Sequence, residues 1–147
     1  MKKEIFYEFH HMGIPTTEVK PNETYSSSAK LHTSDNKGFF KIQWHRFESD
    51  SPLHPLLRTL PHVAFKVNDL KAAIAGEEVI LGPYEPIDDY FVAVINDGGV
   101  PVELIQTALI DEELWRRAKL GQGSLYRRAS LSEVEKSEYS NLANDRA

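Results

Sequence analysis

The chain has 147 residues, a length that suits one domain or two small modules sharing a core. Its hydrophobic (41%) and charged (27%) fractions are ordinary for a globular protein, and a net charge of -5 argues against a nucleic-acid surface, which needs clustered Lys and Arg. The absence of Cys excludes disulfides and thiolate chemistry. No signal-peptide core follows Met1 and no run reaches membrane-spanning length, so we expect a cytoplasmic protein without nucleic-acid or membrane partners.

The first predicted element is a strand over residues 5–14, where apolar and polar side chains alternate. Strict alternation places His11 on one face of this strand and His10 on the other, and Pro15 ends it. A register shift of one residue would exchange the two histidines. We therefore expect His11 to face a site and His10 to face away from it.

A polar segment rich in Ser, Thr and Asn follows over residues 16–38. It contains a weakly predicted short helix around residues 23–31 and ends in a turn. The next strand is predicted over residues 39–47, where alternation puts Gln43 and His45 on the same face. Either of these side chains can therefore face the interior of a site.

The second half of the chain begins after a linker predicted over residues 48–61, which contain three prolines. Residues 62–67 predict a strand. Residues 69–75 predict a short helix, which a side chain at position 68 or 69 caps and a glycine ends. Three further strands are predicted at residues 79–81, 91–96 and 100–107, the last two joined by the hairpin turn Asp97-Gly98-Gly99.

The two halves repeat one pattern of polar side chains. His11 lies in the first strand of the first half, and His62 heads the first strand of the second half. Gln43 and Glu103 each lie in a later strand, flanked by apolar residues. Two nitrogen donors and two oxygen donors from a repeated unit suit one divalent metal ion. A carboxylate among apolar neighbours is also costly to bury without a partner, which favours a ligand role for Glu103.

These residues, with the segments PHVAFKVNDL and PVELIQT, resemble the vicinal oxygen chelate superfamily of glyoxalase I, methylmalonyl-CoA epimerase, extradiol dioxygenases and bleomycin-resistance proteins. The resemblance is greatest to the epimerase branch and covers about residues 5–107. It implies an α+β fold in which two βαβββ-type modules form curved mixed sheets around a cleft. The modules would span about residues 5–50 and 60–107 of a domain over residues 1–107, with the first module shortened. The metal ligands that the resemblance implies are His11, Gln43, His62 and Glu103.

Residues 108–147 form a C-terminal helical extension outside this resemblance. Residues 111–119 predict an amphipathic helix with an acidic first turn and a basic last turn, which complement the helix dipole, and Gly121 ends it. A second helix is predicted from residue 130 or 132 toward residue 142. We interpret the extension as a packing or dimer contact without a role in the chemistry.

Imidazole and carboxylate donors favour Co, Ni, Mn, Zn or Fe over Ca or Mg. Such an ion polarises a substrate carbonyl and stabilises the enolate that forms when the adjacent C–H loses its proton. Glu103 is the candidate base, because Gln43 cannot accept a proton at neutral pH. An inverting enzyme needs a second proton carrier, a role open to His45 or a bound water. His45 is also an alternative to Gln43 as the ligand from the first module.

Three functions fit this pattern. The first is a metal-dependent lyase, isomerase or epimerase acting on a small-molecule substrate with two oxygen donors. The second is a metal-free binding protein like the bleomycin-resistance proteins, although the presence of all four ligand-type residues argues against it. The third is an extradiol-type dioxygenase with ferrous iron on the triad His11, His62 and Glu103. The identity of the metal separates the three, and the sequence leaves a homodimer open.

Overall fold

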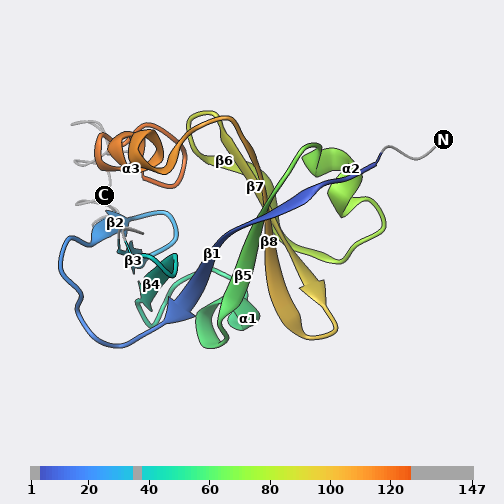
Figure 1. Ribbon diagram of the computed structural model, residues 1–147. Helices are drawn as coiled ribbons and strands as arrows, with labels where there is room; N and C mark the ends of the chain where they lie inside the picture. The colour runs from blue at the N-terminus through green and yellow to red at the C-terminus, as the bar shows by residue number, and fades with distance from the viewer. Residues whose placement is uncertain (1–3, 35–37, 127–147) are drawn as a thin grey trace.

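The computed structural model describes residues 4–34 and 38–126. Over these residues the chain forms one mixed sheet of eight strands with three helices packed against it (Figure 1). The strands are β1 (Tyr7–Pro15), β2 (Thr24–Ser26), β3 (Leu31–Thr33), β4 (Ile42–Phe47), β5 (His62–Val67), β6 (Val79–Ile87), β7 (Tyr90–Asp97) and β8 (Val100–Thr107). The helices are α1 (Pro55–Thr59), α2 (Leu70–Ile74) and α3 (Asp111–Lys119). The second helix predicted for the C-terminal extension lies outside the described residues.

The strand order β2-β3-β4-β1-β5-β8-β7-β6 contains one arrangement twice. In each half the first strand pairs in parallel with the last, β1 with β4 and β5 with β8, and the other two strands follow outward in antiparallel pairs. β1 and β5 pair antiparallel at the centre and join the halves. The predicted α+β fold with a curved mixed sheet is confirmed. The first half is shortened because residues 16–23, all of them described, contain no helix between β1 and β2.

The second half follows its local signals closely. The Asp69 carboxylate accepts a hydrogen bond from the Ala72 backbone N–H (3.0 Å) and so caps α2. Gly98 and Gly99 have φ values of +62° and +98° in the turn between β7 and β8, a left-handed conformation that glycine adopts without a steric penalty. β5, β8 and α3 have the predicted bounds, whereas β6 and β7 are longer than predicted.

The first half departs from its predicted helix. The segment predicted to be helical around residues 23–31 forms the strands β2 and β3, which pair with each other and, through β3, with β4. This polar segment has no apolar helical face to bury, whereas a hairpin beside β4 satisfies its backbone groups. β4 begins at Ile42, later than predicted, because Lys41 has a left-handed φ of +60° that interrupts the strand. The predicted linker over residues 48–61 contains α1, which His54 caps.

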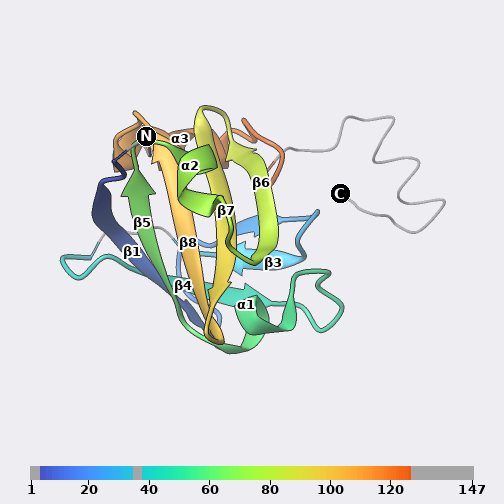
Figure 2. The ribbon, with the colours of Figure 1, turned by 90° about the vertical axis from the view of Figure 1, so that its right-hand side faces the viewer.

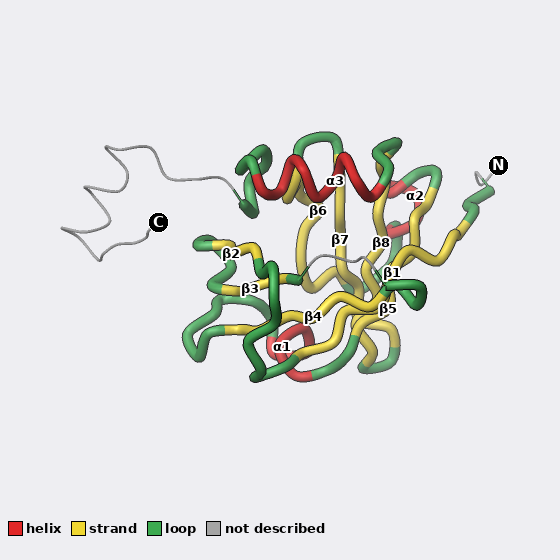
Figure 3. The backbone as a smooth tube through the Cα atoms, turned by 60° about the vertical axis from the view of Figure 1, so that its left-hand side comes forward, coloured by secondary structure: helices red, strands yellow, loops and turns green. Residues whose placement is uncertain are grey.

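Apolar side chains pack on both faces of the sheet. On the outer face α2 covers β5, β7 and β8, where Leu70 and Ala73 belong to the same cluster as Leu104. On the inner face α1 and α3 contribute Leu57 and Leu114 to a larger cluster with β5 to β8. Figure 2 shows α2 in front of the sheet, and Figure 3 shows α3 across the top of the curled sheet. None of the helices in the described part of the chain is long and apolar enough to cross a membrane.

Candidate metal site on the inner face of the sheet

One row of paired residues across the sheet brings together two of the predicted metal ligands, His11 and Glu103. His11 of β1 pairs with Ala64 of β5, and Ala64 pairs with Glu103 of β8. Side chains in one row of a sheet project from the same face, so His11 and Glu103 both point inward. The fully buried Ala64 between them has only a methyl group, which leaves room for the two longer side chains to meet.

The adjacent row holds the other two predicted ligands. Gly13 of β1 pairs with Gln43 of β4 on one side and with His62 of β5 on the other. The His62 ring lies across Gly13, where a Cβ atom would be 2.0 Å from Cε1 of His62. Only glycine at position 13 leaves room for the His62 ring, and no local sequence pattern indicates that requirement.

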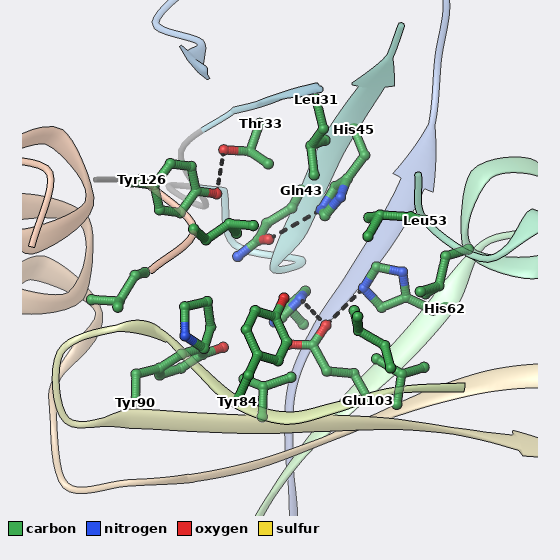
Figure 4. A pocket seen from close by; sticks show the side chains of 18 of the residues that line it. Leu31, Thr33, Gln43, His45, Leu53, His62, Tyr84, Tyr90, Glu103 and Tyr126 are labelled. Atoms are coloured by element: carbon green, nitrogen blue, oxygen red, sulfur yellow. Dashed lines mark hydrogen bonds and ion pairs between the residues drawn. The ribbon is translucent and has the colours of Figure 1, made fainter. Parts of the chain in front are cut away.

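His11, His62 and Glu103 converge in a cluster that Figure 4 shows from close by. The Glu103 Oε1 atom lies 2.9 Å from His62 Nε2 and 3.6 Å from His11 Nε2. Both Nε2 atoms are buried, and neither has a partner in hydrogen-bonding geometry among the described residues. One donor atom from each residue lies within 4.8 Å of the others, so the three could hold a metal ion.

Glu103 carries the negative charge of this cluster. Burial acts to raise the pKa of Glu103, but the neighbouring His11 and His62 outweigh burial and hold that pKa well below its usual range. The carboxylate is therefore ionised in a buried site, beside imidazoles and apolar side chains. A cation bound between the three side chains would compensate this charge.

Gln43 and His45 line the same cavity from β4 (Figure 4). Gln43 is buried, and its Oε1 atom lies 3.4 Å from His45 Nε2. The His45 ring meets His62 edge to face, with ring centres 5.2 Å apart. Burial, followed by the nearby His62 and His11, lowers the pKa of His45 to about 3. Both residues that the sequence offered as the ligand from the first module thus reach the cavity, and His45 is neutral near pH 7.

His10 points inward, so the orientation predicted from strict alternation is wrong. A β-bulge between Phe9 and His11 shifts the register of β1 against β5. The extra residue turns His10 to the same face as His11, and both rings are buried. His10 Nδ1 lies 2.7 Å from His11 Nδ1, and His10 Nε2 lies 3.0 Å from Oδ1 of Asp111. Burial, followed by His11, lowers the pKa of His10, whose ring is therefore neutral near pH 7.

α3 and the segment after it form one wall of the cavity, a role that the sequence interpretation missed. Leu114 and Trp115 of α3 line the cavity, as does Tyr126. The Tyr126 hydroxyl lies 2.7 Å from Thr33 Oγ1, which ties this wall to β3. The amphipathic pattern over residues 111–119 indicated that one face of the helix is buried, but no pattern within the helix shows what it packs against.

The remaining lining is mostly apolar and aromatic. Its larger members include Leu31, Phe47, Leu53, Tyr84 and Tyr90. Among the described residues that line the cavity there is no Lys or Arg. Glu103 is thus the charged group in the described lining, and an anionic ligand would find no cationic side chain there.

Comparison with known proteins supports the fold. No protein-family model matches the chain, and no curated protein matches it. Among solved structures, the chain is similar to the crystal structure of methylmalonyl-CoA epimerase from Mycobacterium tuberculosis, with a TM-score of 0.51 and 16% identity, covering 69% of this chain and 89% of that chain. The fold is vicinal-oxygen-chelate-like. At 16% identity the similarity is evidence for the fold alone.

Proposed function

We propose that this protein is a metal-dependent isomerase or epimerase acting on a small substrate with two oxygen donors. The observation that carries the proposal is the convergence of the buried Nε2 atoms of His11 and His62 on one carboxylate oxygen of Glu103, at 3.6 and 2.9 Å. Two imidazoles and a carboxylate whose donor atoms lie within 4.8 Å of one another form a ligand set that suits a transition-metal ion. The similarity in fold to an epimerase supports the isomerase class.

The proposed ligands are His11, Gln43, His62 and Glu103. Two imidazoles, a carboxylate and an amide oxygen suit Co, Ni, Mn, Zn or Fe. When bound, the ion would supply the Lewis acidity that stabilises negative charge on a substrate oxygen. His45 stays the alternative to Gln43, because their side-chain atoms lie 3.4 Å apart and both line the cavity.

Glu103 is the proposed base, and His45 is the proposed proton carrier on the other face of the substrate. The Glu103 carboxylate would take the proton from the carbon next to a substrate carbonyl. Inversion requires a proton to return to the opposite face of that carbon. His45 lies across the cavity from Glu103 in Figure 4, and because its ring is neutral near pH 7 the proton would come from its N–H or from a water that it holds. One proton leaves the carbon and one returns, and exchange with water would then restore Glu103 and the proton donor, so the reaction is an isomerisation without a co-reactant.

The cavity favours a small neutral substrate. Its volume is about 80 Å³, and a water molecule needs roughly 10–15 Å³ on this scale, so the cavity suits a ligand of about six non-hydrogen atoms. Without Lys or Arg in the described lining, a carboxylate or phosphate group would have no counter-charge from a side chain. A hydroxyketone or diketone meets both conditions.

A second candidate function is an extradiol-type dioxygenase. His11, His62 and Glu103 are the two histidines and one carboxylate of a ferrous triad, and aromatic side chains line the cavity. Oxygen uptake with catechol after reconstitution with ferrous iron would favour this candidate over the isomerase.

Metal content tests the proposed site. Untagged protein would be reconstituted in turn with Mn, Fe, Co, Ni and Zn, and its metal measured by elemental mass spectrometry. We expect about one ion per chain, and its loss in the His11→Ala, His62→Ala double variant. His54→Ala removes an imidazole outside the cavity and should retain the ion. Protein that takes up no metal would overturn the proposal and favour a metal-free binding protein.

Solvent deuterium uptake tests the chemistry without knowledge of the natural substrate. Hydroxyacetone serves as a neutral probe and 2-oxobutanoate as an anionic one, both followed by NMR in D₂O with metal-loaded protein. We expect exchange at carbons next to the carbonyl of hydroxyacetone, and none with the double variant. Exchange in 2-oxobutanoate alone would contradict the neutral substrate.

A further inference from the structure

A chain of three side chains runs from the first turn of α3 to His11. His11 Nδ1 lies 2.7 Å from His10 Nδ1, and His10 Nε2 lies 3.0 Å from Asp111 Oδ1. Lys41, next to β4, donates a hydrogen bond to the other Asp111 oxygen, Oδ2, at 3.0 Å. Both rings are buried, with 2% of His11 and 8% of His10 exposed. These hydrogen bonds therefore link α3 to the interior of the sheet, where the two histidine rings are shielded from solvent.

The directions of these hydrogen bonds follow from the Asp111 end. An ionised carboxylate only accepts hydrogen bonds, so His10 Nε2 carries a proton and donates it to Asp111. A neutral imidazole has a single N–H, which leaves His10 Nδ1 as an acceptor. His11 Nδ1 must then carry the proton that His10 accepts. In the neutral form of His11, which metal binding requires, the lone pair consequently resides on Nε2, the atom that lies 3.6 Å from Glu103 Oε1.

We propose that Asp111 and His10 are positioning residues that hold His11 in the tautomer whose Nε2 lone pair faces the cavity. This inference rests on the proposed function, in which that lone pair binds a cation. Outer partners that fix the tautomer of a histidine ligand typically change metal affinity 10–100-fold. The helix that walls the cavity thereby also supplies the carboxylate that prepares one of its ligands. The β-bulge in β1 makes this arrangement possible, because without it the His10 side chain would lie on the opposite face of the sheet from His11.

Asp111→Asn is expected to reverse the direction of the hydrogen bonds that join residue 111, His10 and His11. Lys41 remains a donor, so the carboxamide oxygen turns toward Lys41 and the NH₂ group toward His10. His10 then accepts at Nε2 and donates from Nδ1, which moves the His11 proton to Nε2. We expect this variant to bind Zn²⁺ 10–100-fold more weakly in titration calorimetry. The matched control is Glu112→Gln, which removes an exposed charge from the same turn of α3 and should keep the affinity of the unmodified protein.

His10 offers a second pair of variants. His10→Asn keeps a carbonyl oxygen near the place of Nδ1, so it can still accept from His11. His10→Leu cannot accept a hydrogen bond. We expect His10→Asn to retain more Zn²⁺ affinity than His10→Leu. Equal losses in the two variants would indicate packing rather than tautomer control.

Proton–nitrogen correlation spectra of the histidine rings decide the inference directly. In the metal-free protein we expect the His11 proton on Nδ1, and in Asp111→Asn on Nε2, a change that a purely structural role would not produce. A neutral His11 ring with its proton on Nε2 and none on Nδ1 in the unmodified protein would overturn the inference, as would equal Zn²⁺ affinities of Asp111→Asn and Glu112→Gln. If the unmodified protein binds no metal, the proposed function fails, whereas the tautomers of the metal-free protein still test the inference.

Discussion

The imidazole ring of His62 occupies the space that a side chain at Gly13 would need, with Cε1 2.0 Å and Nε2 2.5 Å from the position of a Cβ atom there. The two residues are paired across β1 and β5, and His62 is 5% exposed. His45 and His11 both meet the His62 ring edge to face, with ring centres 5.2 and 5.7 Å away. Displacing the His62 ring would therefore also change its contacts with both neighbouring imidazoles.

Gly13→Ala should therefore displace the His62 ring and weaken the proposed site. We expect at least a tenfold loss of Zn²⁺ affinity by titration calorimetry, and a loss of about 1–3 kcal/mol in the free energy of unfolding, as for other overpacked interiors. Gly38→Ala is the control, because nothing lies within 4 Å of a Cβ at Gly38. Unchanged affinity in Gly13→Ala would show that His62 does not bind the ion.

Glu103→Gln should separate proton transfer from metal binding. The amide keeps an oxygen donor but cannot accept the substrate proton, and a positioned base contributes roughly 10²–10⁴-fold to the rate. At saturating metal we expect deuterium uptake into hydroxyacetone to fall at least 100-fold. Glu112→Gln, which changes an exposed carboxylate, should exchange at the rate of the unmodified protein. A rate close to that of the unmodified protein would remove Glu103 as the base.

Leu114→Ala should destabilise the fold, because Leu114 is 2% exposed and packs in the inner core beneath α3. Truncation of a buried leucine costs about 2–5 kcal/mol. Leu120, 54% exposed just after α3, provides the control, and its truncation should change the free energy of unfolding by less than about 0.5 kcal/mol. Urea denaturation measures both. Equal effects would mean that α3 does not pack on the sheet as described.

The Glu23–Arg46 pair predicts a pH dependence of stability. Arg46 donates two hydrogen bonds to the Glu23 carboxylate, at 3.0 and 2.7 Å, and this contact lowers the pKa of Glu23 from its ordinary value of 4.5 to about 2. A carboxylate whose pKa is lower in the folded than in the unfolded state stabilises the fold above pH 4.5, and this stabilisation is lost as the pH falls toward 2.

Glu23→Gln should accordingly be less stable than the unmodified protein by about 1 kcal/mol at pH 7. The difference should shrink between pH 4.5 and pH 2, because protonation removes the same charge from the unmodified protein. Urea denaturation over this range provides the measurement. A difference that stays constant with pH would show that the Glu23 charge does not stabilise the fold.

Local sequence chemistry alone determined most of the second half of the fold. β5, β8 and α3 have their predicted bounds because each carries a complete local signal: alternation in the strands, glycines in the turn before β8, and opposite charges at the two ends of α3. The repeated polar pattern also identified His11, Gln43, His62 and Glu103, which all line one cavity. Two-residue periodicity suffices for this, because it assigns each side chain to a face wherever the strand is regular.

The tertiary structure decided what local patterns could not. The inward orientation of His10 depends on a bulge, which arises from the pairing of β1 with β5 and leaves no clear mark on the sequence of β1. The segment predicted as a helix became β2 and β3 because pairing with β4 satisfies its backbone, and such pairing outweighs a weak helical preference. The apolar face of α3 became a cavity wall because of where the helix packs. Each of these outcomes depends on contacts between residues far apart in the chain, whose free energy exceeds the local preferences that a sequence pattern records.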